Sequence, residues 1–197
     1  MRILHITDVH CGLEPLHRVL SSESFDIVVV SGDLECVEAA EELEPFKDRA
    51  AAVTGNVDDI SVRRYLQSLG VLIDGRVREL GGLRLGGVGG IDHAGDVMAL
   101  RSDLSKAGRL DVLVTHHPPK GVLDRTFMGV RVGLKSIREL SLMVKPRVHL
   151  FGHVHESPGH QAYEGMVAVN PGPLRDGRYA LIELTETDVK VSLRSLV

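Results

Sequence analysis

The sequence predicts an α/β fold in which two packed β-sheets are flanked by helices. Short apolar runs rich in β-branched residues recur along the chain, and longer amphipathic segments separate them. This pattern is typical of strands that alternate with helices. After residue 160 the chain becomes strand-rich. Alternation followed by a meander favours two sheets with helices on the outside.

The strands are predicted from the short runs in which polar residues are rare. Because these runs barely alternate between apolar and polar residues, several strands should be buried on both faces. In chain order the expected strands are 3–7, 25–30, 50–54, 83–88, 112–115, 148–151, 166–169, 178–184 and 189–193.

The helices are predicted from the longer segments, where apolar residues recur at helical spacing. Segment 35–48 carries six acidic residues, which we interpret as a solvated helix face rather than a metal site. In chain order the expected helices are roughly 13–22, 35–48, 59–69, 97–108 and 133–144.

Length and composition indicate a single domain over residues 1–197. Hydrophobic residues make up 43% of the chain and charged residues 25%, a balance typical of globular proteins. The net charge of −4 argues against a protein that coats nucleic acid. No apolar run approaches the roughly 20 residues that span a bilayer, and the N-terminus lacks a signal-peptide pattern. We therefore expect a soluble, cytoplasmic protein without a membrane partner.

The cysteines and the histidines could each have a structural or a chemical role. Cys11 and Cys36 are too few for a disulfide framework, and we interpret both as small buried hydrophobes. The ten histidines are an unusually high number. Histidine is the commonest metal-binding side chain, so the positions of the histidines must show whether they bind metal.

Side chains of the metal-binding type follow five of the expected strands. In open α/β sheets, ligands bind beyond the carboxyl ends of the strands, so residues far apart in sequence can meet there. Gly32, Gly55 and Gly152 each precede such a side chain and permit sharp turns with φ > 0. The candidate metal ligands are Asp8, His10, Asp33, Asn56, His116, His153 and His155.

The chemistry of this set favours transition-metal ions. Imidazole, carboxylate and amide oxygen suit Mn, Fe, Zn, Ni or Co, and the absence of thiolates argues against a structural zinc site. In the pairs Asp8/His10 and His153/His155, alternate residues would point the same way if the chain were locally extended. Seven ligands suit two ions that share a carboxylate, and Asp33 is the natural bridge. Each motif alone is more often structural, but together and in this order they favour a metal centre.

Five motifs resemble the signature blocks of the calcineurin-like metallophosphoesterases. Further similarity, in Thr115-His116-His117-Pro118-Pro119 and Asn170-Pro171-Gly172-Pro173, is to the small, mainly prokaryotic Icc-related branch. The resemblance implies a four-layer α/β fold, two mixed β-sheets packed as a sandwich and flanked by helices, with a dinuclear metal site at the strand ends. The five motifs are Asp8-Val9-His10, Gly32-Asp33, Gly55-Asn56, His116 and Gly152-His153-Val154-His155.

The resemblance also implies how the ligands divide. One ion would take Asp8, His10, Asp33 and His155, and the other Asp33, Asn56, His116 and His153. The ions would be a divalent or mixed-valence pair, manganese before Fe, Zn, Ni or Co. Asp33, Asn56 and His116 would then be the catalytic residues that support a metal-bridging hydroxide.

One position departs from the family pattern. Many members carry a His directly after the Asn, where it is assigned to protonate the leaving group or to bind phosphate. Here Val57 stands at that position, so the general acid is unassigned. We interpret the next residue, Asp58, as a structural acceptor or cap rather than as a proton donor.

The expected function is a metal-dependent phosphoesterase, in the first place a phosphodiesterase, acting on a small phosphoester by in-line attack of the hydroxide. Candidate substrate contacts are His117, Arg125 and Arg131. One alternative is a catalytically weak, metal-binding interaction module with the same fold, and another is a nuclease of the same superfamily. The net negative charge disfavours nucleic acid except as a substrate. The sequence predicts no oligomeric state.

Overall fold

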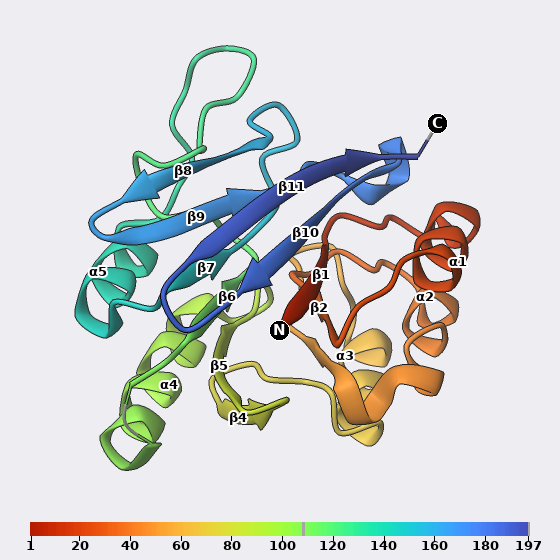
Figure 1. Ribbon diagram of the computed structural model, residues 1–197, viewed down its shortest axis with the longest axis horizontal. Coiled ribbons are helices and arrows are strands. Elements are labelled where there is room, and N and C mark those ends of the chain that lie inside the picture. The colour runs from red at the N-terminus through yellow and green to blue at the C-terminus, as the bar shows by residue number, and fades with distance from the viewer. Residues whose placement is uncertain (108, 197) are drawn as a thin grey trace.

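The computed structural model describes residues 1–107 and 109–196 (Figure 1). The first sheet contains β1 (Arg2–Ile6), β2 (Ile27–Val30), β3 (Ala50–Ala52), β10 (Arg178–Leu184) and β11 (Val189–Ser195). The second contains β4 (Val77–Leu80), β5 (Leu83–Val88), β6 (Val112–Thr115), β7 (Val148–Leu150), β8 (Gly159–Tyr163) and β9 (Met166–Asn170). The helices are α1 (Leu13–Ser22), α2 (Val37–Glu41), α3 (Ile60–Ser68), α4 (His93–Ala107) and α5 (Lys135–Val144), with 3₁₀ turns η1 (Glu44–Arg49) and η2 (Leu174–Asp176).

Both sheets are mixed, as predicted. The first has the order β11-β10-β1-β2-β3, with β1, β2 and β3 parallel and β10 antiparallel to β1. The second has the order β4-β5-β6-β7-β9-β8, and its two edge strands are antiparallel to a parallel centre. The expected sandwich with helices outside is therefore confirmed.

The alternation of side chains along β1 explains the four layers. Ile3 points between the two sheets, into a core shared with Val112 and Val148 of the second sheet. Its neighbour Leu4 points to the opposite face, into a second core with residues such as Leu16 of α1. Figure 1 shows α1, α2 and α3 on the outside of the first sheet and α4 and α5 on the outside of the second. Every central strand is thus buried on both faces, which is why the apolar runs barely alternate.

One expected helix is broken. Segment 35–48 forms the short helix α2 and the separate 3₁₀ turn η1 instead of one helix. Pro45 lies at the first turn of η1, and a proline there cannot donate the backbone hydrogen bond that would continue α2. Glu35 lies before α2, outside any helix.

Two strands and one helix start differ from the sequence-based expectation. The strands β4 and β8 were not expected, because their sequences, Val-Arg-Glu-Leu and Gly-His-Gln-Ala-Tyr, are largely polar. Both lie at sheet edges, where one face remains in solvent and the apolar signal weakens. Helix α4 begins at His93, four residues before the expected start at 97. None of the helices in the described part of the chain is long and apolar enough to cross a bilayer.

Candidate metal centre

The loops after β1, β2, β6 and β7 meet at one rim of the two sheets. The backbone N–H of Asp8 donates to the carbonyl of Gly32 at 3.0 Å, which joins the first two loops. The backbone N–H of Gly152 donates to the carbonyl of His116 at 3.1 Å, which joins the other two. The backbone N–H of His153 donates to Oδ2 of Asp8 at 3.0 Å and so links the two sheets. Residues that are nearly 150 positions apart are therefore neighbours.

Four of the predicted ligands have left-handed backbone. Asp8, His10, Asp33 and His153 have φ values of 52°, 48°, 57° and 70°. Non-glycine residues pay about 1–3 kcal/mol for such a conformation, and these conformations are concentrated at functional sites. The condition of a locally extended chain is therefore not met in either ligand pair, because the chain turns at the ligands.

Two glycines allow the loops to approach the acidic side chains. A Cβ at Gly55 would clash with Oδ1 of Asp33, and a Cβ at Gly152 would clash with Oγ1 of Thr7. Neither glycine has a positive φ; among the three glycines singled out in the sequence, only Gly32 does, at 98°. Close approach, rather than a special turn, is thus what Gly55 and Gly152 provide.

The first ligand group consists of Asp8, His10 and His155, whose candidate ligand atoms all lie within 4.8 Å of one another. Nε2 of His155 is 3.1 Å from Oδ1 of Asp8 and 3.5 Å from Nε2 of His10. Atoms about 3 Å apart can both lie at the metal–imidazole distance of about 2.1 Å from one ion. The three side chains therefore have a spacing that fits a shared cation.

The second group consists of Asp33, His116 and His153, whose candidate ligand atoms also all lie within 4.8 Å of one another. Nε2 of His116 is 3.4 Å from Oδ2 of Asp33 and 2.8 Å from Oδ1 of Asn56. The ring centroids of His116 and His153 are 5.0 Å apart. The structure thus brings all seven predicted ligands together, in two groups with Asn56 beside the second.

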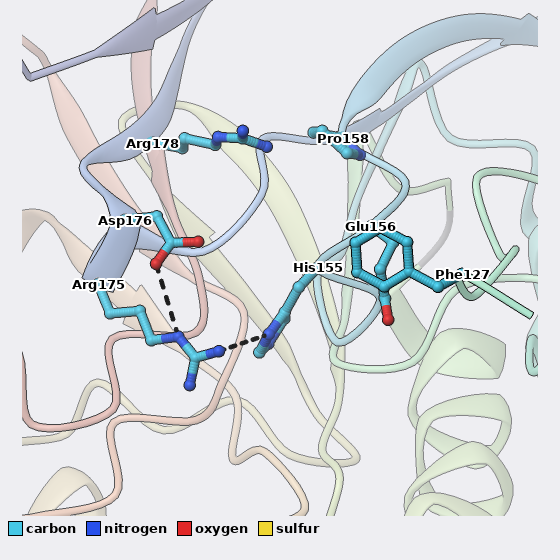
Figure 2. Close-up of a pocket in the computed structure, with 7 residues that line it drawn as sticks. All are labelled: Phe127, His155, Glu156, Pro158, Arg175, Asp176 and Arg178. Carbon is cyan, nitrogen blue, oxygen red and sulfur yellow. Dashed lines mark hydrogen bonds and ion pairs between the residues drawn. The ribbon is translucent and has the colours of Figure 1, made fainter.

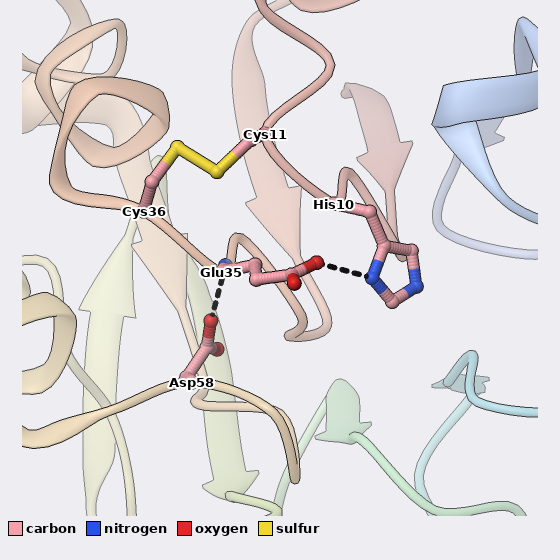
Figure 3. Close-up of a disulfide and its surroundings, with 5 residues drawn as sticks. All are labelled: His10, Cys11, Glu35, Cys36 and Asp58. Carbon is pink, nitrogen blue, oxygen red and sulfur yellow. Dashed lines mark hydrogen bonds and ion pairs between the residues drawn. A yellow bond between two sulfur atoms is a disulfide. The ribbon is translucent and has the colours of Figure 1, made fainter.

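Hydrogen bonds fix the tautomers of two of these histidines. Nδ1 of His10 donates to the Glu35 carboxylate at 2.8 Å, and Nδ1 of His116 donates to the carbonyl of Ser31 at 2.9 Å. Because both partners can only accept, the neutral rings keep a lone pair on Nε2. Figure 3 shows Glu35 reaching His10 from the loop that follows Asp33. Sequence reasoning missed Glu35, since it was counted with the acidic helix face.

His155 differs from the other two. Nη2 of Arg175 donates to its Nδ1 at 3.3 Å (Figure 2), so the proton lies on Nε2 and faces Asp8. A cation at Nε2 requires the proton on Nδ1 instead. The contact with Arg175 and metal binding by Nε2 therefore exclude each other.

The electrostatics of the site fit cations. The lone pair on Nε2 of the buried His116 faces the carbonyl oxygen of Asn56 and the carboxylate of Asp33. All three groups are hydrogen-bond acceptors, and while the ring is neutral none of them donates a proton to another. Burial, with added repulsion from Asp8, raises the pKa of the Asp33 carboxyl above its ordinary value. Burial would also raise the pKa of the Asp8 carboxyl, but the hydrogen bonds that it accepts from His155 and Thr7 help to lower it to about 2. A divalent cation would satisfy the acceptors and both carboxylates.

Asp58 holds the ligand loops in place. Its carboxylate accepts hydrogen bonds from the backbone N–H groups of Asp33 at 3.1 Å, Glu35 at 2.7 Å and Gly55 at 2.7 Å. The side chain is buried. The interpretation of Asp58 as a structural acceptor is confirmed, and Val57 beside it is 43% exposed and carries no proton donor.

The interpretation of the cysteines was wrong. Cys11 and Cys36 form a disulfide across 25 residues, and Cys11 lies at the surface (Figure 3). Cys11 directly follows His10, and Cys36 directly follows Glu35. The bond therefore joins the loop of one ligand to the loop of its hydrogen-bond partner.

The predicted substrate contacts lie in different places. The His117 ring is 4.5 Å from that of His153, and burial lowers the pKa of its imidazole to about 3. Arg131 donates to the buried Asp124 at 2.7 Å, and with Arg125 it lines a cavity that contains none of the predicted ligands. The structure therefore keeps His117 at the site but not the two arginines. The arginines beside the site are Arg175 and Arg178, which share a pocket with His155.

Comparisons with known proteins agree with this fold. The model of the calcineurin-like phosphoesterase superfamily domain matches residues 1–187. An uncharacterized protein of Methanocaldococcus jannaschii is 27% identical over 198 residues, which cover 88% of each chain.

Two solved structures are similar in fold. A protein of Thermus thermophilus has a TM-score of 0.71 at 17% identity, over 97% of both chains. A novel archaeal phosphodiesterase has a TM-score of 0.63 at 15% identity, over 98% of this chain and 100% of that one. Because the family model spans nearly the whole sequence and every predicted ligand, the chain belongs to the calcineurin-like phosphoesterase superfamily, a class of metal-dependent phosphoesterases.

Proposed function

We propose that this protein is a dinuclear-metal-dependent phosphodiesterase that hydrolyses a small phosphoester. The observation that carries the proposal is the meeting of seven ligand-type side chains in two groups at one rim of the sandwich. Membership of the superfamily and the fold likeness to an archaeal phosphodiesterase support it.

The two groups would hold one ion each. The first ion would bind to Asp8, His10 and His155, the second to Asn56, His116 and His153, and Asp33 would bridge them. The donor set of imidazole and oxygen suits manganese, our first candidate, as well as Fe, Zn, Ni or Co. When bound, the ions would supply a hydroxide for in-line attack and neutralise charge on the phosphoryl oxygens.

Residues around the ligands prepare the site for this chemistry. Glu35 and the carbonyl of Ser31 keep the Nε2 lone pairs of His10 and His116 directed at the two groups. Asn56 adds an oxygen ligand without adding negative charge, which leaves more of the positive charge of the ions for phosphate. Val57 cannot donate a proton to a leaving group. We therefore propose that esters with acidic leaving groups react faster than alkyl esters.

The direct test is metal-dependent hydrolysis of bis(p-nitrophenyl) phosphate. Protein stripped with a chelator should be inactive, and manganese should restore activity. Asp33→Asn and His153→Gln should remove activity even with manganese present. His160→Gln, at an exposed position of β8, is the matched control and should keep full activity.

Three results would contradict the proposal. Near-wild-type hydrolysis by either ligand variant would refute the ligand assignment. Tight metal binding without hydrolysis of mono- or diesters would favour the interaction module with the same fold. A rate on single-stranded DNA far above that on small diesters would instead indicate a nuclease.

We further propose that residues 1–197 act as one domain in the cytoplasm. A reducing cytosol would open the disulfide between Cys11 and Cys36. Alkylation of the protein directly in lysed cells, followed by mass spectrometry, should find both thiols free. Recovery of the oxidised form would contradict the cytoplasmic location.

A further inference from the structure

A cavity of about 550 Å³ opens beside the first ligand group (Figure 2). It begins at His155, and the other lining residues come from three segments: the loop after β7, the turn η2 with the start of β10, and the loop before α5. A diester has two arms around its phosphate. One of these arms needs space beside the ligand groups, and this cavity adjoins the first group at His155. The lining residues are Phe127, His155, Glu156, Pro158, Arg175, Asp176 and Arg178.

One wall of the cavity presents cationic side chains. Arg175 donates to the imidazole of His155, a contact that a cation at Nε2 of His155 would end, and it also lies 3.8 Å from the carboxylate of Asp176, which stays its partner in either case. The guanidinium of Arg178 has no hydrogen bond or ion pair with the residues that the structure describes, and Figure 2 shows it extending toward Pro158. Its stem lies over Gly172, where a Cβ would be 2.9 Å from Cδ of Arg178. Arg178 is thus the available cation of the pocket.

The other wall presents an aromatic ring. Phe127 is 92% exposed at the tip of a turn closed by a hydrogen bond from the N–H of Thr126 to the carbonyl of Val130 at 3.0 Å. An exposed Phe gains free energy when a planar group covers it. The turn is anchored, since Oγ of Ser157 donates to the carbonyl of Arg125 at 2.6 Å. This bond ties the aromatic wall to the loop that carries His155.

The cationic wall is anchored in the same way. The backbone N–H of Leu174 in η2 donates to the carbonyl of Thr7 at 2.9 Å, directly before Asp8. Both walls are therefore bonded to loops that carry predicted ligands of the first group. A group bound between them would lie at a fixed position relative to the ions, which is what positioning of a substrate requires.

We propose that this pocket binds the second arm of a diester substrate, and that this arm carries a planar ring and an additional anionic group. Arg178 pairs with the anionic group, and Phe127 stacks on the ring. Glu156, which also lines the pocket, suits ring N–H donors. The proposal deepens the phosphodiesterase function and rests on it.

Two chromogenic esters test Arg178. The p-nitrophenyl ester of thymidine 5′-phosphate and its 3′-phosphorylated form differ only in the additional anionic group. Charge-assisted hydrogen bonds to Arg178 should give the 3′-phosphorylated ester a KM lower by about tenfold or more. Arg178→Gln should remove this difference with little change in kcat. Arg64→Gln, an exposed arginine of α3, is the matched control and should preserve it.

Phe127→Ala tests the ring. It should raise KM for both thymidine esters several-fold, by the loss of about 1 kcal/mol or more of stacking, and leave KM for methyl p-nitrophenyl phosphate unchanged. An equal rise for all three substrates would contradict a stacking role.

A binding measurement separates the pocket from the catalysis. Thymidine 3′,5′-bisphosphate and thymidine 5′-phosphate are titrated into metal-free protein by NMR. Wild-type protein should bind the bisphosphate more tightly, and Arg178→Gln should bind both equally. Equal binding by the wild type, or an unchanged difference in Arg178→Gln, would overturn the pocket. Absence of hydrolysis with a preserved binding difference would overturn the phosphodiesterase function alone.

Discussion

Nδ1 of His10 donates a hydrogen bond to Oε2 of Glu35 at 2.8 Å, and the disulfide between the next residues, Cys11 and Cys36, joins the same two loops. The carboxylate fixes the proton on Nδ1 and so directs the Nε2 lone pair at the first ligand group. Such partners raise the basicity of a metal-binding histidine, and their loss costs about 10–100-fold in metal affinity.

Glu35→Ala should therefore weaken one of two manganese sites by about 10–100-fold and leave the other nearly unchanged. Competition titration with a metal-sensitive dye measures both affinities. Glu38→Ala, an exposed acid of α2, is the control. Equal affinities in Glu35→Ala and the control would show that Glu35 does not support a ligand.

Val57 gives a prediction about leaving groups. The wild type should hydrolyse diesters faster as the leaving-group alcohol becomes more acidic. Val57→His should accelerate the hydrolysis of alkyl esters more than that of aryl esters, because a positioned acid contributes about 10²–10⁴-fold in rate where the leaving group needs a proton. Rates for a series of leaving groups, measured with chemistry as the slow step, give the slope. A wild-type rate independent of leaving-group acidity would contradict the account.

Two buried histidines, His5 in β1 and His149 in β7, should make the stability of the protein depend on pH. Burial lowers the pKa of His5 and of His149 to about 3 from an ordinary value of 6.5. Between these values the unfolded chain binds protons that the folded chain does not, so the free energy of unfolding falls as pH drops below 6.5. At a pH about one unit below 6.5, each histidine should lower the free energy of unfolding by about 1.4 kcal/mol.

The check is urea unfolding as a function of pH. His149→Gln should lose stability less steeply than the wild type, whereas His160→Gln at the surface should follow the wild type. Parallel curves for all three proteins would show that His149 is not held neutral in the folded state.

Gly152 tests the close approach of the loops. A Cβ there would clash with Thr7 and with the Asp8 carboxylate, so Gly152→Ala should cost about 2–3 kcal/mol of stability and weaken metal binding. Gly70→Ala is the control, since Gly70 has a positive φ but nothing within 4 Å of a Cβ; it should cost about 1–2 kcal/mol and leave metal binding intact. Unimpaired metal binding in Gly152→Ala would contradict the packing argument.

The disulfide predicts an effect of reductant on stability. Cys11 and Cys36 close a loop of 25 residues, so the bond should stabilise the oxidised protein by about 3 kcal/mol. Dithiothreitol should lower the Tm of the wild type but not that of Cys11→Ser/Cys36→Ser. An identical Tm for the wild type with and without reductant would exclude a stabilising bond.

Most of the fold and the meeting of the candidate ligands could be predicted from the sequence, because buried strands leave apolar runs and the candidate ligands follow these runs directly. The edge strands β4 and β8 could not, since a strand with one solvated face has no such run. The break between α2 and η1 could have been found, because Pro45 marks it.

The residues around the ligands were harder to predict. Glu35 is 25 residues from His10, its hydrogen-bond partner, and no local sequence pattern distinguishes Glu35 or Arg178 from solvated charges. The disulfide could not be predicted, because the sequence does not show how far apart Cys11 and Cys36 lie in the folded chain. Arg125 and Arg131 were favoured by their glycine-containing loop, but Arg131 is neutralised by the buried Asp124. Tertiary contacts decide these roles.

Anomalous diffraction from crystals grown with manganese tests the central claim most directly. Data collected at the manganese absorption edge should show two peaks in each molecule, one bounded by Asp8, His10 and His155 and the other by Asp33, His116 and His153. No peak between these side chains, from crystals shown by fluorescence to contain manganese, would contradict it.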